Sequence, residues 1–157
     1  MQPKGTLELH RFNGTEIFKI SKAEIFVLTE EDGSHVINLE IDTEEAPIQT
    51  LPDTESLRAH PNAEVTAKLD SLNPDEWTGQ SFHTTNSEDL DCRLYYCEHE
   101  DVENVHIQVK RQVGNRFHVH WAGTATDVNF YDGSKPDTRI EVDAWFVFSD
   151  YLNWKLK

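Results

Sequence analysis

Apolar and polar residues alternate with a period of two along most of this chain, and this pattern constrains its fold more than any other feature. Successive side chains of a β-strand point to opposite faces, so the alternation predicts strands with one face on the core and one in water. The pattern is clearest at 105–109, 117–121 and 140–148. We therefore expect an all-β fold, an antiparallel β-sandwich or barrel of about nine strands with at most one short helix.

The first two strands are expected to form a hairpin at Asn13-Gly14, because this dipeptide is a strong two-residue turn signal. A turn there pairs Leu9 with Phe18 and Leu7 with Ile20. The same register sets opposite charges across the hairpin, in the pairs Arg11–Glu16 and Glu8–Lys19.

A length of 157 residues fits a single β domain spanning 1–157. Residues 73–89 are polar and turn-rich, and long for a plain connection, so they form a candidate functional loop. Cys92 and Cys97 are five residues apart, which places them on opposite faces of one strand and predicts free thiols. No signal-like apolar segment follows Met1, and no apolar run reaches the length of a membrane helix, so we expect a cytoplasmic protein without membrane contact.

The net charge of −15 is unevenly distributed along the chain. Residues 1–50 hold four Lys or Arg against ten Asp or Glu, residues 51–100 three against eleven, and residues 101–157 seven against eight. Such a negative field repels nucleic acid phosphates and attracts basic protein surfaces. It also simply keeps a protein soluble, and both interpretations stay open.

Three histidines are candidate metal ligands. His118 and His120 occupy alternate positions of one strand and so share a face. A three-residue loop at 113–115, with Asn115 in the left-handed conformation, pairs Val109 with Val119 and puts His106 on that face too, diagonal to His120. The three imidazoles could bind Zn²⁺ or another divalent metal, although Lys110 beside His118 would oppose a cation.

Aromatic residues near the end of the chain suggest a second kind of site. Trp145 lies on the nominally outward face of the last strand, and Tyr151 and Trp154 follow it. These three residues could line a ligand-binding groove for a sugar or another flat molecule, or the tail could fold over Trp145.

Local motifs of catalysis are missing from the sequence: it has no Walker loop, nucleophile elbow or zinc-protease helix. The acidic stretch at 98–103 could supply calcium ligands, but EF-hand spacing is absent. We therefore expect a non-catalytic acidic interaction module that binds a protein partner with a basic surface, for example as an immunity-type inhibitor, with no required cofactor and no affinity for nucleic acid. The alternatives are a small-molecule or carbohydrate-binding β domain, and a metal-dependent enzyme that uses the histidine face.

Overall fold

The computed structural model describes residues 5–52, 54, 59–69, 71–83, 91–126, 128–129 and 134–155. Their backbone forms ten strands, one turn of 3-10 helix and one short α-helix. The elements are β1 Gly5–Arg11, β2 Gly14–Thr29, β3 His35–Thr43, β4 Asn62–Lys68, η1 Pro74–Glu76, β5 Ser81–His83, β6 Asp91–Tyr96, β7 Glu98–Asp101, β8 Glu103–Val113, β9 Arg116–Ala125, β10 Thr138–Val147 and α1 Tyr151–Lys155. No helix among them is long and apolar enough to cross a membrane.

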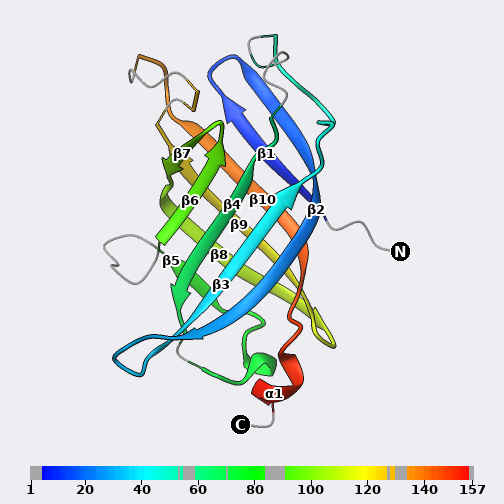
Figure 1. Ribbon diagram of the computed structural model, residues 1–157, viewed down its shortest axis with the longest axis vertical. Coiled ribbons are helices and arrows are strands. Elements are labelled where there is room, and N and C mark those ends of the chain that lie inside the picture. The colour runs from blue at the N-terminus through cyan, green and yellow to red at the C-terminus, as the bar shows by residue number, and fades with distance from the viewer. Residues whose placement is uncertain are drawn as a thin grey trace.

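All ten strands belong to one sheet, in the order β5-β8-β9-β10-β1-β2-β3-β4-β6-β7. Neighbours in this order are antiparallel, and one short parallel bridge joins Val147 of β10 to Glu24 of β2. The sheet curls around its own core, with β3, β4 and β6 in front of β8 and β9 (Figure 1). The all-β antiparallel prediction is confirmed, in the form of a single curled sheet.

Val102 links two distant strands of this order, since it lies between the end of β7 and the start of β8. Its N–H donates to the carbonyl of Cys92 on β6 at 2.9 Å. On its other side is Gly123 of β9, where an added Cβ would lie 2.6 Å from Val102 Cγ1. Because Gly123 has no side chain, Val102 can lie close to β9. The chain therefore passes directly from β7, at one edge of the sheet, to β8, which pairs with β9.

Inward-facing side chains of every long strand form one continuous hydrophobic core. The large residues Phe18, Trp121 and Phe146 are fully buried within it. The lower end in Figure 1 is covered by η1 and α1. There Trp77 packs against Phe117 and Phe148, with ring centroids 5.4 and 5.3 Å apart. The alternation in the sequence thus correctly identified the buried faces of the long strands β8, β9 and β10, whereas β7 has no buried residue.

The first hairpin has a different register from the one expected. Leu7 pairs with Phe18 and Leu9 with Glu16, so the turn falls at 12–13 and the register is shifted by two residues. A shift of two leaves every side chain on the same face. Hydrophobic burial therefore could not distinguish the two registers, and the expected pairs Leu9–Phe18 and Leu7–Ile20 were wrong.

The β8–β9 hairpin has the expected pairing of Val109 with Val119. Its turn, however, is the two-residue Gly114-Asn115, and Gly114 rather than Asn115 is left-handed, with φ 59°. An irregularity between Val109 and Arg111 absorbs the extra residue, so Arg111 stands opposite His118 where Lys110 was expected.

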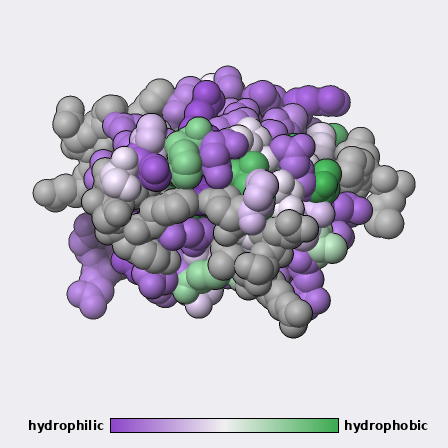
Figure 2. Space-filling view, turned by 90° about the horizontal axis from the view of Figure 1, so that it is seen from above, coloured by the Kyte–Doolittle hydropathy of each residue, from purple (hydrophilic) through white to green (hydrophobic). Residues whose placement is uncertain are grey.

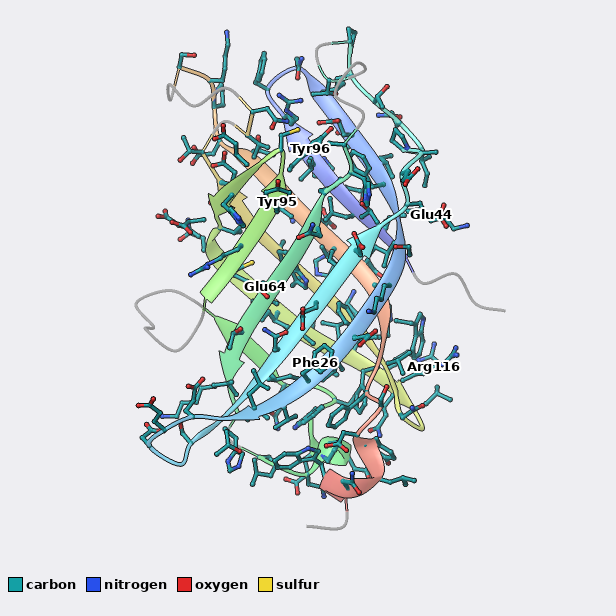
Figure 3. All side chains as sticks on the ribbon, in the orientation of Figure 1. Phe26, Glu44, Glu64, Tyr95, Tyr96 and Arg116 are labelled. Atoms are coloured by element: carbon teal, nitrogen blue, oxygen red, sulfur yellow. The ribbon has the colours of Figure 1, made fainter. Side chains whose placement is uncertain are left out.

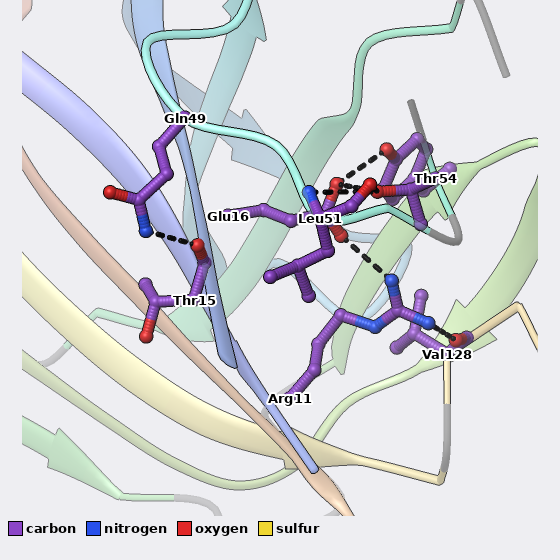
Figure 4. A network of polar contacts seen from close by, with 8 residues as sticks. Arg11, Thr15, Glu16, Gln49, Leu51, Thr54 and Val128 are labelled. Carbon is purple, nitrogen blue, oxygen red and sulfur yellow. Dashed lines mark hydrogen bonds and ion pairs between the residues drawn. The ribbon is translucent and has the colours of Figure 1, made fainter. Parts of the chain in front are cut away.

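A buried polar network closes the upper interior of the sheet (Figure 4). Arg11 forms an ion pair with Glu16 at 3.0 Å, and both side chains are fully buried. Glu16 also accepts hydrogen bonds from the hydroxyls of Thr54 at 2.8 Å and Tyr96 at 2.9 Å. Arg11 donates a further bond to the carbonyl of Val128 at 3.1 Å. Glu16, which was expected directly opposite Arg11, is therefore its ion-pair partner. The two residues are diagonal neighbours on the hairpin, and both side chains point into the interior of the sheet.

Candidate functional site

A hollow of about 310 Å³ lies on the outer face of β2, β3, β4, β6 and β7. Outward side chains at successive strands form its walls, because residues at every second position share this face. Phe26 of β2, Glu64 of β4 and Tyr95 of β6 line it and are labelled in Figure 3, on the strands nearest the viewer. The lining residues are Lys22, Glu24, Phe26, Glu40, Ile41, Asp42, Asn62, Ala63, Glu64, Arg93, Tyr95 and His99.

A row of carboxylates runs across the middle of this hollow. Glu24 of β2 pairs directly with Glu40 of β3, and Glu40 pairs with Glu64 of β4. The row continues with Arg93 of β6, which is opposite Glu64, and ends with Asp101 of β7. Three like charges therefore stand side by side on adjacent strands, an arrangement that destabilises a sheet. We refer to Glu24, Glu40 and Glu64 as the carboxylate row.

Repulsion between the carboxylates of the row affects its central residue, Glu40. Desolvation, followed by repulsion from Glu64 and Glu24, raises the pKa of Glu40 above its usual value, and Lys22 opposes this only weakly. Lys22 itself is 3.1 Å from Glu24. Lys22 and Arg93 also line the hollow, but Glu24, Glu40, Asp42 and Glu64 outnumber them, so the hollow carries a net negative charge and can accept a cation from outside.

Aromatic side chains flank the carboxylate row at two sides. Phe26 is 39% exposed and Tyr95 is 40% exposed, unusually open for residues of their size. The ring of Tyr95 also contacts that of His99, with centroids 4.8 Å apart. Aromatic faces attract cations and pack against the aliphatic part of a lysine or arginine side chain. Carboxylates between aromatic rings are thus suited to a basic side chain.

A second hollow of about 290 Å³ adjoins the first at His99 and is lined mainly by acidic residues of β7 and its surroundings. Glu100, Asp101, Glu103 and Asp137 contribute to it. Within the described residues, these carboxylates do not bring three possible ligand atoms within 4.8 Å of one another. The second hollow extends the negative surface without forming a compact cation site.

The histidines expected to bind metal lie on the outer face of β8 and β9. His118 is 2.6 Å from Asp143, and His120 is 3.0 Å from Glu141, so each imidazole meets a carboxylate of β10. His106 is opposite Ala122, two residues along from the pair Gln108–His120, and is therefore diagonal to His120 as expected. Ligand atoms of His106, His118 and His120 do not form a compact group among the described residues. Metal binding by these three stays a prediction.

The aromatic residues of the predicted ligand groove lie in two separate places. Trp145 stacks on His118, with centroids 5.3 Å apart, and Arg111 lies 6.0 Å above its ring. Tyr151 and Trp154 belong to α1 and are buried at the lower end of the sheet. The tail thus covers the end of the core and leaves Trp145 on the outer face, so the three residues do not line one groove.

The remaining expected positions are partly outside the described residues. Trp77 is buried and its indole N–H donates to the carbonyl of Ser71 at 3.0 Å, so this side chain anchors the start of the loop at 73–89. Residues 84–90 lie outside the described residues. Cys92 is buried and Cys97 is exposed, and no disulfide joins them, as their spacing predicts.

Sequence reasoning did not identify the carboxylate row. Each of its glutamates is an ordinary outward residue of an alternating strand, and only the register across three strands brings them together. No protein-family model, curated protein or solved structure matches this chain.

Proposed function

We propose that this protein is a non-catalytic interaction module that binds a basic protein surface through the hollow around the carboxylate row. The single observation that carries the proposal is the alignment of Glu24, Glu40 and Glu64 on three adjacent strands. Like charges in direct opposition cost stability, and residues that violate a stability rule on a folded surface point to a function.

The chemistry of the hollow supports a lysine or arginine of the partner as the group bound at its centre. The carboxylates would meet the cationic head, while Phe26 and Tyr95 would pack against its aliphatic part. Glu100, Asp101 and Glu103 in the adjoining hollow would then face further basic residues around the contact. One concrete form of such a partner is an enzyme whose basic site this protein covers. Two free thiols support a cytoplasmic setting.

The proposal is tested by a pull-down from native lysate at low salt, with the wild-type chain compared with a groove variant. The groove variant carries Glu24→Gln, Glu40→Gln and Glu64→Gln. The matched control carries Glu30→Gln, Glu31→Gln and Glu45→Gln, three exposed glutamates outside the hollow, and therefore has the same net charge. We expect a basic protein that the wild type and the control retain and that the groove variant loses.

Two outcomes would contradict the proposal. If the wild type enriches no basic protein, the proposed partner class is wrong. If both variants lose the captured protein equally, net charge alone, and not the carboxylate row, is responsible for the binding. A kinetic measurement with the captured partner separates these effects further, because long-range attraction raises the association rate and salt screens it.

The single variant Glu40→Gln should show directly how much the carboxylate row destabilises the folded protein. Removing the central charge relieves repulsion from Glu24 and Glu64, so the free energy of unfolding at pH 7 should rise by a few tenths of a kcal/mol, up to about 1 kcal/mol. Urea denaturation measures this change, and Glu30→Gln is the control for loss of an isolated exposed charge. A fall in stability would show that the row is not strained.

A further inference from the structure

A second cluster of ionisable side chains lies on the outer face of β1, β9 and β10, away from the hollow. Glu8 of β1 pairs directly with Glu141 of β10, and His10 follows Glu8 at the next outward position. On the other side of β10, Ala122 of β9 is opposite Glu141, so His120 is its diagonal neighbour. Three strands therefore contribute two histidines and two glutamates to one patch.

Glu141 is the centre of this patch. Its Oε1 atom is 3.0 Å from His120 Nε2, and its Oε2 atom is 3.4 Å from His10 Nε2. Single ligand atoms of Glu8, His10 and Glu141 all lie within 4.8 Å of one another, the one such group among the described residues.

The environment of His10 is the second observation. Its Nε2 atom is buried and has no hydrogen-bond partner among the described residues, although Glu141 is close. Its other ring nitrogen, Nδ1, is 3.2 Å from the hydroxyl of Thr15. When Nδ1 donates to that hydroxyl, Nε2 presents a lone pair toward a carboxylate, and a metal cation between them would satisfy both groups. A hydrogen bond on the second ring nitrogen is the usual arrangement of a metal-binding histidine.

We propose that Glu8, His10, His120 and Glu141 bind one divalent metal ion of the borderline class, with Zn²⁺ as the best match. Imidazole nitrogen and carboxylate oxygen both bind Zn²⁺ at about 2.0–2.2 Å, which places neighbouring ligand atoms of a tetrahedral site roughly 3.4 Å apart. The two distances to Glu141 are close to that value, but they run to different carboxylate oxygens. Glu8, His10 and Glu141 form the compact group, and the imidazole of His120 must turn toward it to complete the site.

This site differs from the histidine set that the sequence suggests. It shares only His120 with that set, because His118 is held by Asp143 at 2.6 Å and stacks on Trp145. One local charge opposes the metal: Arg139 lies 3.8 Å from Glu141, on a side chain that is 59% exposed and free to turn into solvent. The net charge of −15 favours cation binding at long range.

Isothermal titration of the full chain, after chelator treatment and dialysis, with ZnCl₂ tests the proposal. We expect one Zn²⁺ per chain with micromolar or tighter affinity, and a rise in melting temperature with Zn²⁺ because the ion binds only the folded state. His10→Ala and His120→Ala should each weaken binding by more than ~10-fold, since each removes a ligand. His118→Ala is the matched control, on the same strand and face as His120, and should change affinity less than ~3-fold, because it removes no ligand.

A third variant tests the proposal in the opposite direction. Arg139→Gln removes the cation that competes for Glu141, so it should bind Zn²⁺ more tightly than the wild type. Far-UV circular dichroism of each variant without metal checks that it is folded. The proposal is overturned if the wild type takes up no Zn²⁺ at about 100 µM, well above the affinity expected of a protein zinc site. It is equally overturned if His118→Ala loses as much affinity as folded His10→Ala, or if Arg139→Gln weakens binding.

Discussion

Arg11 and Glu16 show how single residues decide the stability of this sheet. Their ion pair is fully enclosed, and Thr54 and Tyr96 donate hydrogen bonds to the same carboxylate. Removing a charge from water is costly, and partners that satisfy it must remain in place. The network therefore ties Thr54 to β1, β2 and β6 through Arg11, Glu16 and Tyr96.

The Glu16→Ala variant should accordingly be severely destabilised. It leaves the Arg11 guanidinium buried without its counterion, so we expect the free energy of unfolding in urea to fall by about 3–5 kcal/mol. Glu44→Ala is the control, because Glu44 pairs with Lys19 on the surface at 3.9 Å. Its cost should stay below about 1 kcal/mol. Similar losses in the two variants would show that the buried network adds nothing.

Tyr96 should make the fold sensitive to alkali. Burial, and then repulsion from Glu16, raise the pKa of its phenol well above its usual value. The unfolded chain releases this proton near pH 10, so the contribution of Tyr96 is complete below about pH 10 and is lost as the pH rises further.

Urea denaturation from pH 8 to 11 measures this dependence. Tyr96→Phe keeps the ring that packs edge-on against Phe18 at 5.6 Å, and it should flatten the decline in stability at high pH. Tyr95→Phe, on the exposed face of the same strand, should leave the decline unchanged. An unchanged decline in Tyr96→Phe would assign it to other groups.

At the scale of elements, α1 and η1 act together as a cover for the lower end of the core. Tyr151 donates a hydrogen bond to Asp75 of η1 at 2.6 Å, and its ring packs against Phe117. Trp154 packs edge-on against His35, with centroids 5.4 Å apart, and its indole N–H donates to Asp150. A helix of five residues has little stability alone, so these contacts determine its position.

Two substitutions on α1 separate packing from helix formation. Trp154 is 8% exposed and Leu152 is 68% exposed. Trp154→Ala should lower the free energy of unfolding by about 3 kcal/mol, because it removes a large buried side chain. Leu152→Ala should change it by less than about 0.5 kcal/mol. Equal effects would mean that the helix does not depend on its contacts with the core.

At the scale of the whole molecule, the negative charge acts on folding as well as on recognition. Hydrophilic residues dominate the end of the molecule seen from above, with hydrophobic ones scattered among them (Figure 2). The two hollows add acidic walls on one side of the sheet. A chain of net charge −15 repels itself when compact, and salt screens that repulsion.

The melting temperature should therefore rise with salt. Between about 10 mM and 150 mM NaCl the Debye length shrinks from ~30 Å to ~8 Å, so distant carboxylates cease to repel one another. The variant with Glu30→Gln, Glu31→Gln and Glu45→Gln loses three of the 15 net negative charges and should respond less. Differential scanning calorimetry measures both, and a melting temperature that falls with salt would show that attractive pairs outweigh the repulsion.

The sequence by itself determined most of the strands and their buried faces, although β5 and β7 lie in segments interpreted as a loop and as an acidic stretch. Side-chain direction in a strand is a local property with a period of two, so the alternation at 117–121 and 140–148 correctly identified inward residues without any knowledge of the partners. The same parity correctly placed His118 and His120 on one face and separated Cys92 from Cys97.

Only the tertiary structure decided which outward residues meet. Hydrophobic burial has no direction along a strand, so it fixes the face of each residue but permits shifts of register by two, as the first hairpin shows. The carboxylate row depends on the register of β2, β3 and β4, and the patch around Glu141 depends on β1 and β9 flanking β10. A hairpin such as β8–β9 takes part of its register from its turn, whereas strands distant in sequence, such as β1 and β10, find their order and register only in the folded sheet.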